Sequence, residues 1–344
     1  MSGGVDSSTS AIVLQQNGYE VIGCTMNLWN QNEEENKAII DAKEVCEKLG
    51  IEHYVLNCED EFKCHVVDQF IREYTNARTP NPCVECNKYL KFGYFYEKAK
   101  ELNCNYIATG HYARIEYSEK YNQYVLKKSN EEVKDQTYFL YTITKERLEH
   151  IVFPLQEYLS KEDIRKIAED NGLKIAHKKE SQEICFIPDN DYQNFLHKHG
   201  ELKNKKGKIV LTNGEELGTH NGLTNYTIGQ RKGLGISYKK PLYVIKLDKD
   251  KNQVIVGEEE KLYNNVLYAN RVNWIIDFKE NDFPIKCKAK IRYRAKEAEA
   301  LVYQENDQVK VEFIENQRAI TPGQSVVFYD YDGIVLGGGK ICDF

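Results

Sequence analysis

The first residues whose types and spacing suggest chemistry form the segment Ser2–Ser8, with the sequence SGGVDSS. Two adjacent glycines, an acid and two hydroxyls run into the apolar stretch Ala11–Leu14, which predicts a tight loop that opens a helix. Backbone N–H groups at the positive end of a helix dipole suit a phosphate or pyrophosphate, and the hydroxyls of Ser2, Ser7 and Ser8 can add donors. The Lys of the G-x-x-x-x-G-K-[ST] pattern is absent, which argues against a kinase-type P-loop. A glycine-rich turn that only caps a helix is the simpler alternative.

Three cysteines form a second group with chemical potential. Cys83 and Cys86 stand at C-x-x-C spacing after Pro80 and Pro82, and Cys185 lies in an apolar, strand-like segment after a basic run. The prolines predict an extended loop, and a thiol just before a helix is favoured as thiolate, so a nucleophile is plausible here. A structural zinc site needs four ligands, and no second C-x-x-C exists. A thioredoxin-type dithiol has different flanking residues, and Cys185 taken alone reads as a core cysteine.

The composition is that of an ordinary globular protein. The chain has 344 residues, 41% of them hydrophobic, and a net charge of −6, which argues against a histone-like grip on nucleic acid but leaves room for a local basic face. No apolar run approaches the length of a membrane helix and no leader pattern is visible, so we expect a cytoplasmic protein. In a reducing compartment most cysteines are small core residues. That expectation covers Cys24, Cys46, Cys58, Cys64, Cys104, Cys287 and Cys342.

The elements that must position the opening loop alternate between strands and helices up to about residue 115. Residues 19–26, 52–58 and 105–113 read as buried strands, and residues 37–50 read as an amphipathic helix that Gly50 ends. Strands that alternate with helices predict an α/β layer with a parallel sheet.

The predicted secondary structure changes after about residue 200. Before that point, Ser160 and Asp163 stand at capping-box spacing ahead of a helix that Gly172 can end. Beyond it, short alternating strands are separated by Asn-Gly, Asp-Lys and Pro-Gly turns. The C-terminal third is therefore predicted to be all-β, as a small barrel.

A basic stretch lies within this all-β part, at residues 286–296, KCKAKIRYRAK. If the stretch is one strand, the period of two places all its basic side chains on one face. Such a face suits phosphates, although a solvated barrel face is the plainer interpretation. The six basic residues are Lys286, Lys288, Lys290, Arg292, Arg294 and Lys296.

Taken together, the segments carry a resemblance that none carries alone. The opening loop resembles the PP-loop of the ATP pyrophosphatases, and the order of motifs along the whole chain resembles the tRNA-specific 2-thiouridylases of that superfamily. The motifs are SGGVDS at 2–7, TPNPCxxCN at 79–87, ATGHYA at 108–113, KDQTYFL at 134–140, SQxICFI at 181–187, GQRKGLGI at 229–236, RYR at 292–294 and TPGQS at 321–325.

This resemblance implies a fold and a domain division. The fold is α/β, with a parallel-sheet PP-loop domain of the adenine nucleotide α-hydrolase type, then a small central domain and a C-terminal β-barrel. The division expected is 1–194 for adenylation and thiolation, 195–260 for the central domain and 261–344 for the tRNA-binding barrel. In the family a buried strand precedes the loop, whereas only Met1 precedes Ser2 in this sequence.

The resemblance also implies a reaction. ATP, with Mg²⁺ associated with Asp6, adenylates the C2 oxygen of uridine 34, the wobble base of tRNAs for Lys, Glu and Gln. Sulfur then replaces that oxygen, and AMP and pyrophosphate are released. Cys185 would carry the sulfur as a persulfide and Cys86 would be the nucleophile, with a transient disulfide between them. A sulfur-donor protein or relay is the implied partner, and no membrane is involved.

Further residues are carried over by position. The ATP-binding positions are Ser2, Gly3, Gly4, Val5, Asp6, Ser7, Met26 and Gly110. The tRNA-contacting positions are Asn81, Pro82, Cys83, His111, Lys134, Asp135, Gln136, Arg292, Tyr293 and Gln324.

Several alternatives stay open from the sequence. Some family members have Asp at the Cys83 position, so an acid's role in proton transfer is in question here. Three thiols at one site also permit an iron–sulfur cluster held by Cys83, Cys86 and Cys185, which ranks second. A PP-loop amidating ligase and a non-catalytic RNA-binding protein are the other function classes. The first would need ammonia or glutamine and no cysteine, and the second would show no ATP turnover.

Overall fold

The chain forms two compact units, each described here by itself. The computed structural model describes residues 1–29, 33–156, 160–173, 184–187, 189, 191–200 and 205–343. The first unit contains residues 1–66, 83–188 and 333–335, and the second contains residues 67–82, 189–332 and 336–344. The three-domain division stays a prediction. None of the helices among the described residues is long and apolar enough to cross a membrane.

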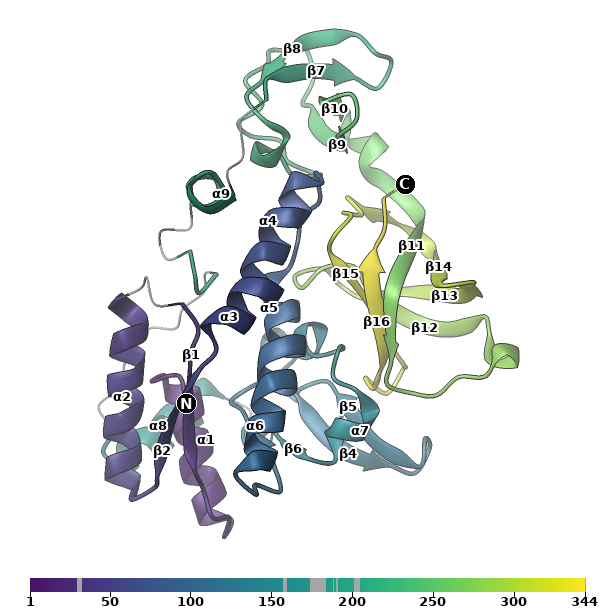
Figure 1. The fold of residues 1–344 in the computed structure, drawn as a ribbon. Helices are drawn as coiled ribbons and strands as arrows, with labels where there is room; N and C mark the ends of the chain where they lie inside the picture. The colour runs from purple at the N-terminus through teal and green to yellow at the C-terminus, as the bar shows by residue number, and fades with distance from the viewer. Residues whose placement is uncertain are drawn as a thin grey trace. The chain divides into compact units, whose positions relative to one another are not determined.

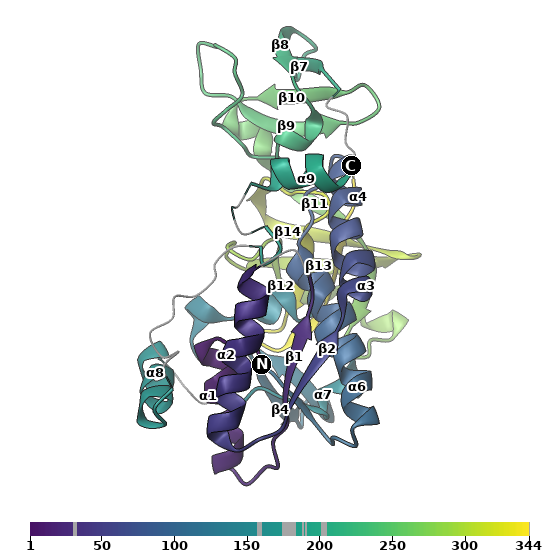
Figure 2. The same cartoon turned by 60° about the vertical axis from the view of Figure 1, so that its left-hand side comes forward.

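The first unit contains parallel strand pairs with helices beside them, as the α/β pattern predicts. β1 (Gly23–Asn27) pairs in parallel with β2 (His53–Asn57), and β3 (Ile107–Ala108) pairs in parallel with β6 (Ile151–Val152). In both ribbon views β1 and β2 lie between α2 and α6 (Figure 1, Figure 2). An antiparallel hairpin and the helices complete the unit: β4 (Arg114–Ser118), β5 (Gln123–Lys127), α1 (Val5–Gln16), α2 (Glu33–Leu49), α3 (Glu59–Phe62), α5 (Pro82–Glu85), α6 (Phe95–Glu101), α7 (Lys145–Leu148) and α8 (Lys161–Asp170).

The predicted helix after the opening loop is α1, and it is buried along most of its length. Its apolar residues join a core cluster with side chains from α2 and α8. Buried hydroxyls are tolerated because they donate to carbonyls: Ser10 Oγ to Asp6 O at 2.8 Å, and Thr9 Oγ1 to Ile164 O of α8 at 3.2 Å. One half of the expected capping box of α8 is present, since Asp163 N–H donates to Ser160 Oγ at 3.1 Å and Ser160 thereby caps the helix. This packing fixes the start of α1 against the start of α8.

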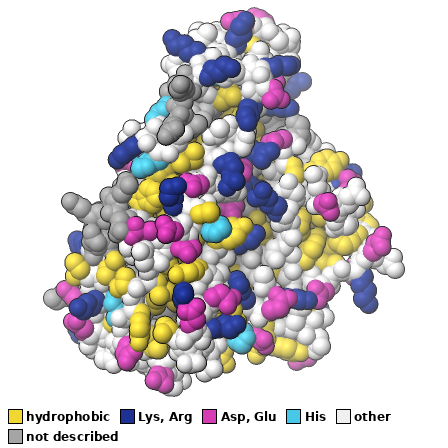
Figure 3. All heavy atoms as spheres, in the orientation of Figure 1, with side chains coloured by type: hydrophobic (Ala, Val, Ile, Leu, Met, Phe, Trp, Pro, Cys, Tyr) yellow, Lys and Arg dark blue, Asp and Glu magenta, His cyan; other side chains and the backbone are white. Residues whose placement is uncertain are grey.

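The second unit is mostly β, as predicted. A four-stranded sheet has the order β8 (Glu216–His220), β7 (Gly207–Leu211), β10 (Gln253–Gly257), β9 (Tyr243–Asp248). Many Lys and Arg side chains cover this sheet on the face that Figure 3 shows. The closed barrel has the order β11 (Tyr263–Trp274), β14 (Gln308–Arg318), β13 (Ala298–Glu305), β12 (Ile285–Lys290), β15 (Ser325–Tyr329), β16 (Val335–Ile341), and the unit also holds α4 (Asp68–Thr75) and α9 (Tyr192–Gly200).

Several sequence expectations are wrong in detail. The strand expected at residues 52–58 is not buried, since Tyr54 and Val55 of β2 are 39% and 48% exposed. The basic stretch 286–296 is not one strand, because β12 ends at Lys290 and Ala295 N–H donates to Arg292 O in a turn. The segment around Cys185 is not a strand in its described part, since Ile187 N–H donates to Ile184 O at 2.8 Å, which closes a turn. The preceding residues 178–183 lie outside the described residues. Cys64 is exposed rather than a core residue.

Candidate active site

The opening loop has the geometry of an anion-binding loop. Gly4 is the N-cap of α1 with an extended backbone, and no side chain caps the helix start. Gly3 has a φ of +61°, and a Cβ there would lie 2.7 Å from Ala38 O, so only glycine fits. The helix therefore presents backbone N–H groups at its positive end, without a side chain that competes for them.

The loop hydroxyls form hydrogen bonds within the loop. Ser7 Oγ donates to Gly4 O at 3.1 Å and Ser8 Oγ donates to the same carbonyl at 3.0 Å. Ser2 N–H donates to Ser7 Oγ at 3.1 Å. In this structure these hydroxyl protons tighten the loop, which leaves the backbone N–H groups as its donors toward an anion.

Asp6 is held in place by two side chains from distant parts of the chain. Tyr112 Oη donates to Asp6 Oδ1 at 2.9 Å, and Lys161 Nζ of α8 donates to the same oxygen at 2.5 Å. Lys161 is 7% exposed, and its ammonium also lies 5.8 Å from the centre of the Tyr112 ring. A buried cation is stable here because the carboxylate and the ring face compensate its lost hydration.

Asp6 fits the magnesium that the PP-loop resemblance implies. Both contacts above use Oδ1, so Oδ2 stays available as the hard oxygen ligand that Mg²⁺ prefers. Among the described residues no three His, Cys, Asp or Glu side chains gather to hold a metal ion. Magnesium commonly binds through one carboxylate together with the phosphates of its nucleotide, which matches a single acid beside an anion loop.

Two further predicted ATP positions lie at the carboxyl ends of strands. Met26 is near the end of β1, and Gly110 follows β3. A Cβ at Gly110 would lie 3.0 Å from both Asp6 C and Asp6 Cβ, so the Gly110 backbone touches the loop directly. Because ligands of parallel sheets bind beyond the carboxyl ends of the strands, both positions suit a nucleotide.

The predicted tRNA segment Lys134–Gln136 contacts the same tyrosine that holds Asp6. Tyr112 N–H donates to Gln136 Oε1 at 3.0 Å, and Gln136 N–H donates to Tyr112 O at 2.9 Å. Lys134 Nζ lies 5.4 Å from the centre of the Tyr112 ring. Asp135 is only 2% exposed and accepts from Ser129 N–H and Thr137 Oγ1, so in this structure it orders its own loop.

His111, another predicted tRNA position, is half-buried between aromatic rings and a lysine. Its Nδ1 lies 2.8 Å from Thr109 Oγ1, and its Nε2 lies 3.4 Å from Lys91 Nζ. Burial first, and the charge of Lys91 second, hold the pKa of His111 well below its usual value. The imidazole is therefore neutral, and Nε2 accepts from the Lys91 ammonium.

Cys86 is the first residue of a π-helical segment, Cys86–Tyr94, that continues directly from α5. The helical run begins at Pro82, a favoured first helical residue, so Cys86 lies one turn inside the helix rather than just before it. Its side chain is buried at 8% exposure, and burial raises the pKa of the thiol above its ordinary value. The expectation that a helix N-terminus favours the thiolate is therefore wrong for Cys86 in this structure.

The charge of Lys91 offsets part of the rise in the thiol pKa that burial causes. Its positive charge lowers the pKa of Cys86, and it acts in the same direction on Cys83, whose thiol pKa desolvation raises. Lys91 follows Cys86 by five residues, which is the hydrogen-bond spacing of a π-helix. Among the described residues, Lys91 on this π-helical segment thus supplies positive charge that favours the thiolate form of the buried Cys86.

Cys185 has the opposite exposure. It is exposed in the turn Ile184–Ile187, whereas its neighbour Phe186 is 4% exposed and packs edge-on against Phe62 with ring centres 5.5 Å apart. The buried neighbours fix the turn and leave the Cys185 side chain in contact with solvent. Among the described residues no three Cys, His, Asp or Glu side chains gather to hold a single metal ion, and the iron–sulfur alternative at Cys83, Cys86 and Cys185 stays a hypothesis.

The remaining predicted tRNA positions belong to the second unit, except Cys83. Pro82 begins α5 and is buried, Asn81 precedes it, and Cys83 is exposed in the first turn. Arg292 and Tyr293 lie in the turn beyond β12, where Lys290 Nζ is 5.6 Å from the centre of the Tyr293 ring. Since the strand has ended, both neighbours can face RNA without the conflict that strict alternation would impose.

Sequence reasoning missed Lys161 and Lys91. Lys161 directly follows the helix cap Ser160, where its charge opposes the helix dipole, so its position alone signals an acidic partner. Lys91 gave no such signal, because the usual helical spacing of three or four residues would not place it beside Cys86.

Comparison with known proteins covers nearly the whole chain. Residues 1–189 match a family model described as tRNA methyl transferase HUP domain, residues 193–258 match tRNA methyl transferase PRC-barrel domain, and residues 264–341 match Aminomethyltransferase beta-barrel domain. The chain is 48% identical to the tRNA-specific 2-thiouridylase MnmA of Clostridioides difficile, over 99% of this chain and 96% of that protein. It belongs to the tRNA-specific 2-thiouridylase family.

Other relatives of this family agree closely. The chain is 49% identical to the tRNA-specific 2-thiouridylase MnmA of Acetivibrio thermocellus, over 99% of this chain and 97% of that protein. It is 50% identical to the tRNA-specific 2-thiouridylase MnmA 1 of Caldanaerobacter subterraneus, over 99% of this chain and 96% of that protein. The expected 2-thiouridylase fold is confirmed: an α/β HUP domain is followed by a central domain and a closed C-terminal barrel.

Proposed function

We propose that this chain catalyses the ATP-dependent 2-thiolation of uridine 34 in tRNA, as a tRNA-uridine 2-sulfurtransferase. The observation that carries the proposal is 48–50% identity to curated 2-thiouridylases over 99% of the chain. The structure agrees with it, because an open anion loop and a buried thiol whose pKa a lysine lowers occur in the same unit. The tRNAs expected are those for Lys, Glu and Gln, and the expected site of action is the cytoplasm.

The first step is adenylation. The loop Ser2–Ser7 would hold the β- and γ-phosphates of ATP through its backbone N–H groups, with Met26 and Gly110 beside the nucleotide. Asp6, fixed by Lys161 and Tyr112, would hold the magnesium, which supplies charge neutralisation at the phosphates. The C2 oxygen of uridine 34 attacks the α-phosphorus, the bond to the β-phosphate bridge breaks, and pyrophosphate leaves.

The second step replaces oxygen by sulfur. The terminal sulfur of a Cys185 persulfide is delivered to C2, and the C2–oxygen bond breaks as AMP leaves. The Cys86 thiolate attacks Cys185 Sγ, which breaks the persulfide bond and closes a Cys86–Cys185 disulfide. The sulfane sulfur gains two electrons and the two cysteines lose two, so a thiol reductant must reopen the disulfide before the next turnover.

Exposure supports this division of roles. An exposed Cys185 can accept sulfur from a donor protein, whereas a buried Cys86 is protected from side reactions. We further propose that Asn81, Pro82, Cys83 and His111 lie near the target base. Lys134, Asp135, Gln136, Arg292, Tyr293 and Gln324 would contact or order contacts to the rest of the RNA.

The test is pyrophosphate release from ATP with unmodified tRNA that carries U34, compared with the same transcript carrying C34, under reducing conditions without a sulfur donor. We expect release with U34 only. Cys86→Ser and Cys185→Ser should keep this release but form no 2-thiouridine. Release that requires ammonia or glutamine instead of tRNA would indicate an amidating ligase, and no release at all would contradict the proposal.

A further inference from the structure

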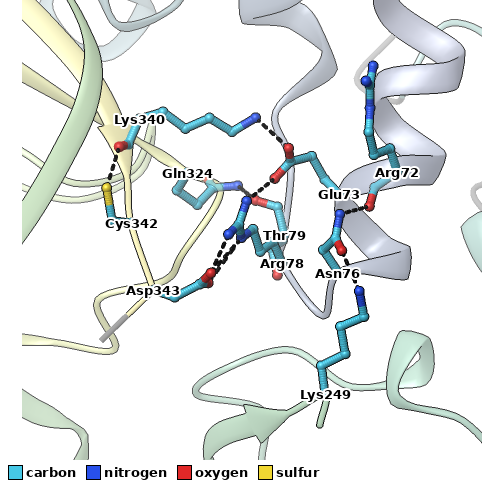
Figure 4. Close-up of polar contacts among 10 residues, drawn as sticks. All are labelled: Arg72, Glu73, Asn76, Arg78, Thr79, Lys249, Gln324, Lys340, Cys342 and Asp343. Carbon is cyan, nitrogen blue, oxygen red and sulfur yellow. Dashed lines mark hydrogen bonds and ion pairs between the residues drawn. The ribbon is translucent and has the colours of Figure 1, made fainter. Parts of the chain in front are cut away.

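The loop between α4 and α5 is held by a turn of the barrel. Thr79 N–H donates to Pro322 O at 3.0 Å. Gln324 Nε2 donates to Thr79 O at 2.9 Å and to Pro80 O at 3.3 Å, and Figure 4 shows the Gln324 amide reaching Thr79. A Cβ at Gly323, whose φ is +90°, would lie 3.0 Å from Thr79 O. The turn Thr321–Gln324 therefore contacts the loop backbone directly, whatever the loop side chains are.

Charged groups hold the start of the same loop. Arg78 Nε donates to both carboxylate oxygens of Asp343 at 3.0 Å, and the guanidinium lies 3.9 Å from Glu73 Oε2 (Figure 4). Glu73 Oε1 in turn pairs with Lys340 Nζ at 3.1 Å, and Glu73 is only 4% exposed. An arginine fork on a carboxylate fixes orientation as well as position.

A lysine of the four-stranded sheet makes a further contact. Lys249 Nζ, in the turn after β9, donates to Asn76 Oδ1 at 2.6 Å. Asn76 directly follows α4, so this contact holds the point where the loop leaves the helix.

The loop needs these external contacts, because it has little structure of its own. Residues 78–81 lie in no helix or strand, and Pro80 and Pro82 have no N–H with which to form internal hydrogen bonds. The loop continues into Asn81 and Pro82, and Cys86 follows Asn81 by five residues through α5. Contacts that fix the backbone at Thr79 and Pro80 therefore also fix the position of Asn81 and Pro82, which are proposed to lie at the target base.

We propose that Gln324 and Arg78 are positioning residues for thiolation, which set the backbone of residues 78–82 from the end of the barrel. This inference rests on the proposed function and gives Gln324 a task beyond the RNA contact that family resemblance implies. Gln324, Lys340 and Asp343 lie at one end of the barrel and hold the loop and the helix before it through hydrogen bonds and ion pairs. Since Ile341 N–H donates to Gln324 O at 2.9 Å, the two anchoring strands β15 and β16 are themselves joined at that end.

The test compares Gln324→Met, which keeps the length of the side chain and removes both donors, with Gln304→Met. Gln304 is exposed at the β13 end and donates to Asn306 O, so the control variant removes a similar bond away from the loop. We expect Gln324→Met to lower the single-turnover thiolation rate at saturating tRNA by about tenfold, because it removes two hydrogen bonds that order the loop. The dissociation constant for tRNA should change less than about twofold, and Gln304→Met should change neither value.

Hydrogen exchange gives a readout independent of activity. The Thr79 amide, bonded to Pro322 O, should exchange faster in Gln324→Met than in the wild type and Gln304→Met, because the two carbonyls that follow it, Thr79 O and Pro80 O, then lose the Gln324 donor. If Gln324→Met does not fold, Arg78→Lys replaces it. That variant keeps the charge and removes the fork, so it should lower the saturating rate in the same direction with tRNA affinity maintained.

A weaker tRNA affinity with an unchanged saturating rate would overturn the proposal, because Gln324 would then act only as an RNA contact. Unchanged rate, affinity and exchange would overturn it as well. If the wild-type chain itself forms no 2-thiouridine, the proposed function fails, and the exchange experiment still decides whether Gln324 orders the loop.

Discussion

At the scale of single residues, the candidate site is organised by two buried or half-buried lysines rather than by its cysteines alone. Lys161 fixes the carboxylate of Asp6, and Lys91 contacts the neutral His111 while its charge lowers the pKa of the Cys86 thiol. Each lysine offsets an electrostatic cost of burial: a carboxylate that must stay in place, and a thiolate that burial disfavours.

The first residue-scale prediction concerns Lys91. Its charge lowers the pKa of Cys86 while burial raises it, so Lys91→Met should raise that pKa further. The thiolate fraction at a fixed pH below the pKa then falls. Alkylation of the Cys86 peptide by iodoacetamide, followed by mass spectrometry across pH, should shift to higher pH. Lys88→Met removes a lysine of the same helix and should leave the profile in place; an equal shift in both variants would contradict the role of Lys91.

A second prediction concerns the buried pair Glu73–Lys340. Lys340→Met leaves the Glu73 carboxylate buried without its closest cation, so it should lower the free energy of unfolding by about 3 kcal/mol. Adding Glu73→Gln removes the charge and should restore most of that stability. Urea unfolding in a Trp29→Phe background lets Trp274, stacked on Phe328, report on the barrel. Equal stability of the single and double variants would show that the charge at Glu73 is compensated elsewhere.

At the scale of elements, the ends of helices and strands decide the chemistry. The start of α1 forms the candidate anion site, the end of β3 brings Gly110 to Asp6, and the change from α5 to π-helix at Cys86 sets the position of Lys91. The regular interiors only hold these ends in place.

The close approach of Gly110 gives an element-scale prediction. Gly110→Ala puts a methyl group 3.0 Å from backbone and side-chain atoms of Asp6, so the loop must shift at a cost of about 1–3 kcal/mol. ATP affinity, measured by calorimetry, should fall roughly tenfold or more. The control Gly218→Ala meets only the end of the Ile236 side chain at 3.2 Å and should bind ATP normally. Normal ATP binding by Gly110→Ala would contradict the fit of this glycine to the loop.

The shortened basic strand gives another element-scale prediction. Lys286, Lys288 and Lys290 share one face of β12, so replacing all three by Met should weaken tRNA binding and flatten its dependence on salt. The logarithmic slope should fall by about 0.7–0.9 for each phosphate that these lysines neutralise in the wild type. A triple Met variant at Lys43, Lys98 and Lys100 of the first unit changes the net charge equally and serves as control. An identical salt slope in both triple variants would remove β12 from the RNA footprint.

The sequence predicted the types of these elements better than their ends. The alternation in 286–296 correctly indicated a strand, but β13 pairs Ala298 with Ala289, so the chain must reverse between them and the strand stops at Lys290. Alternation along one strand contains no information about where its partner begins. The π-helix at Cys86 was equally invisible, because the apolar spacing of residues 86–94 does not distinguish it from an α-helix.

At the scale of the whole molecule, the chain passes repeatedly between its two compact units. Residues 67–82 belong to the second unit although both flanking segments belong to the first. The interactions responsible join residues far apart in sequence, such as Arg78 and Asp343, whose charges match many other residues equally well. Local patterns in a single sequence predict which helices and strands each domain contains. Long-range pairs such as this one are seen only in the folded structure.

The central claim is that sulfur on Cys185 replaces the C2 oxygen of uridine 34 at the expense of ATP. The most direct measurement loads the protein with persulfide by inorganic polysulfide, removes the excess, adds ATP with unmodified U34 tRNA, and quantifies nucleosides after digestion. We predict equal amounts of 2-thiouridine, AMP and pyrophosphate from the wild type, and pyrophosphate without 2-thiouridine from Cys185→Ser, which has no sulfur to displace AMP from the adenylated tRNA. A wild-type protein that carries the persulfide and forms no 2-thiouridine, or a Cys185→Ser variant that forms as much as the wild type, would contradict the claim.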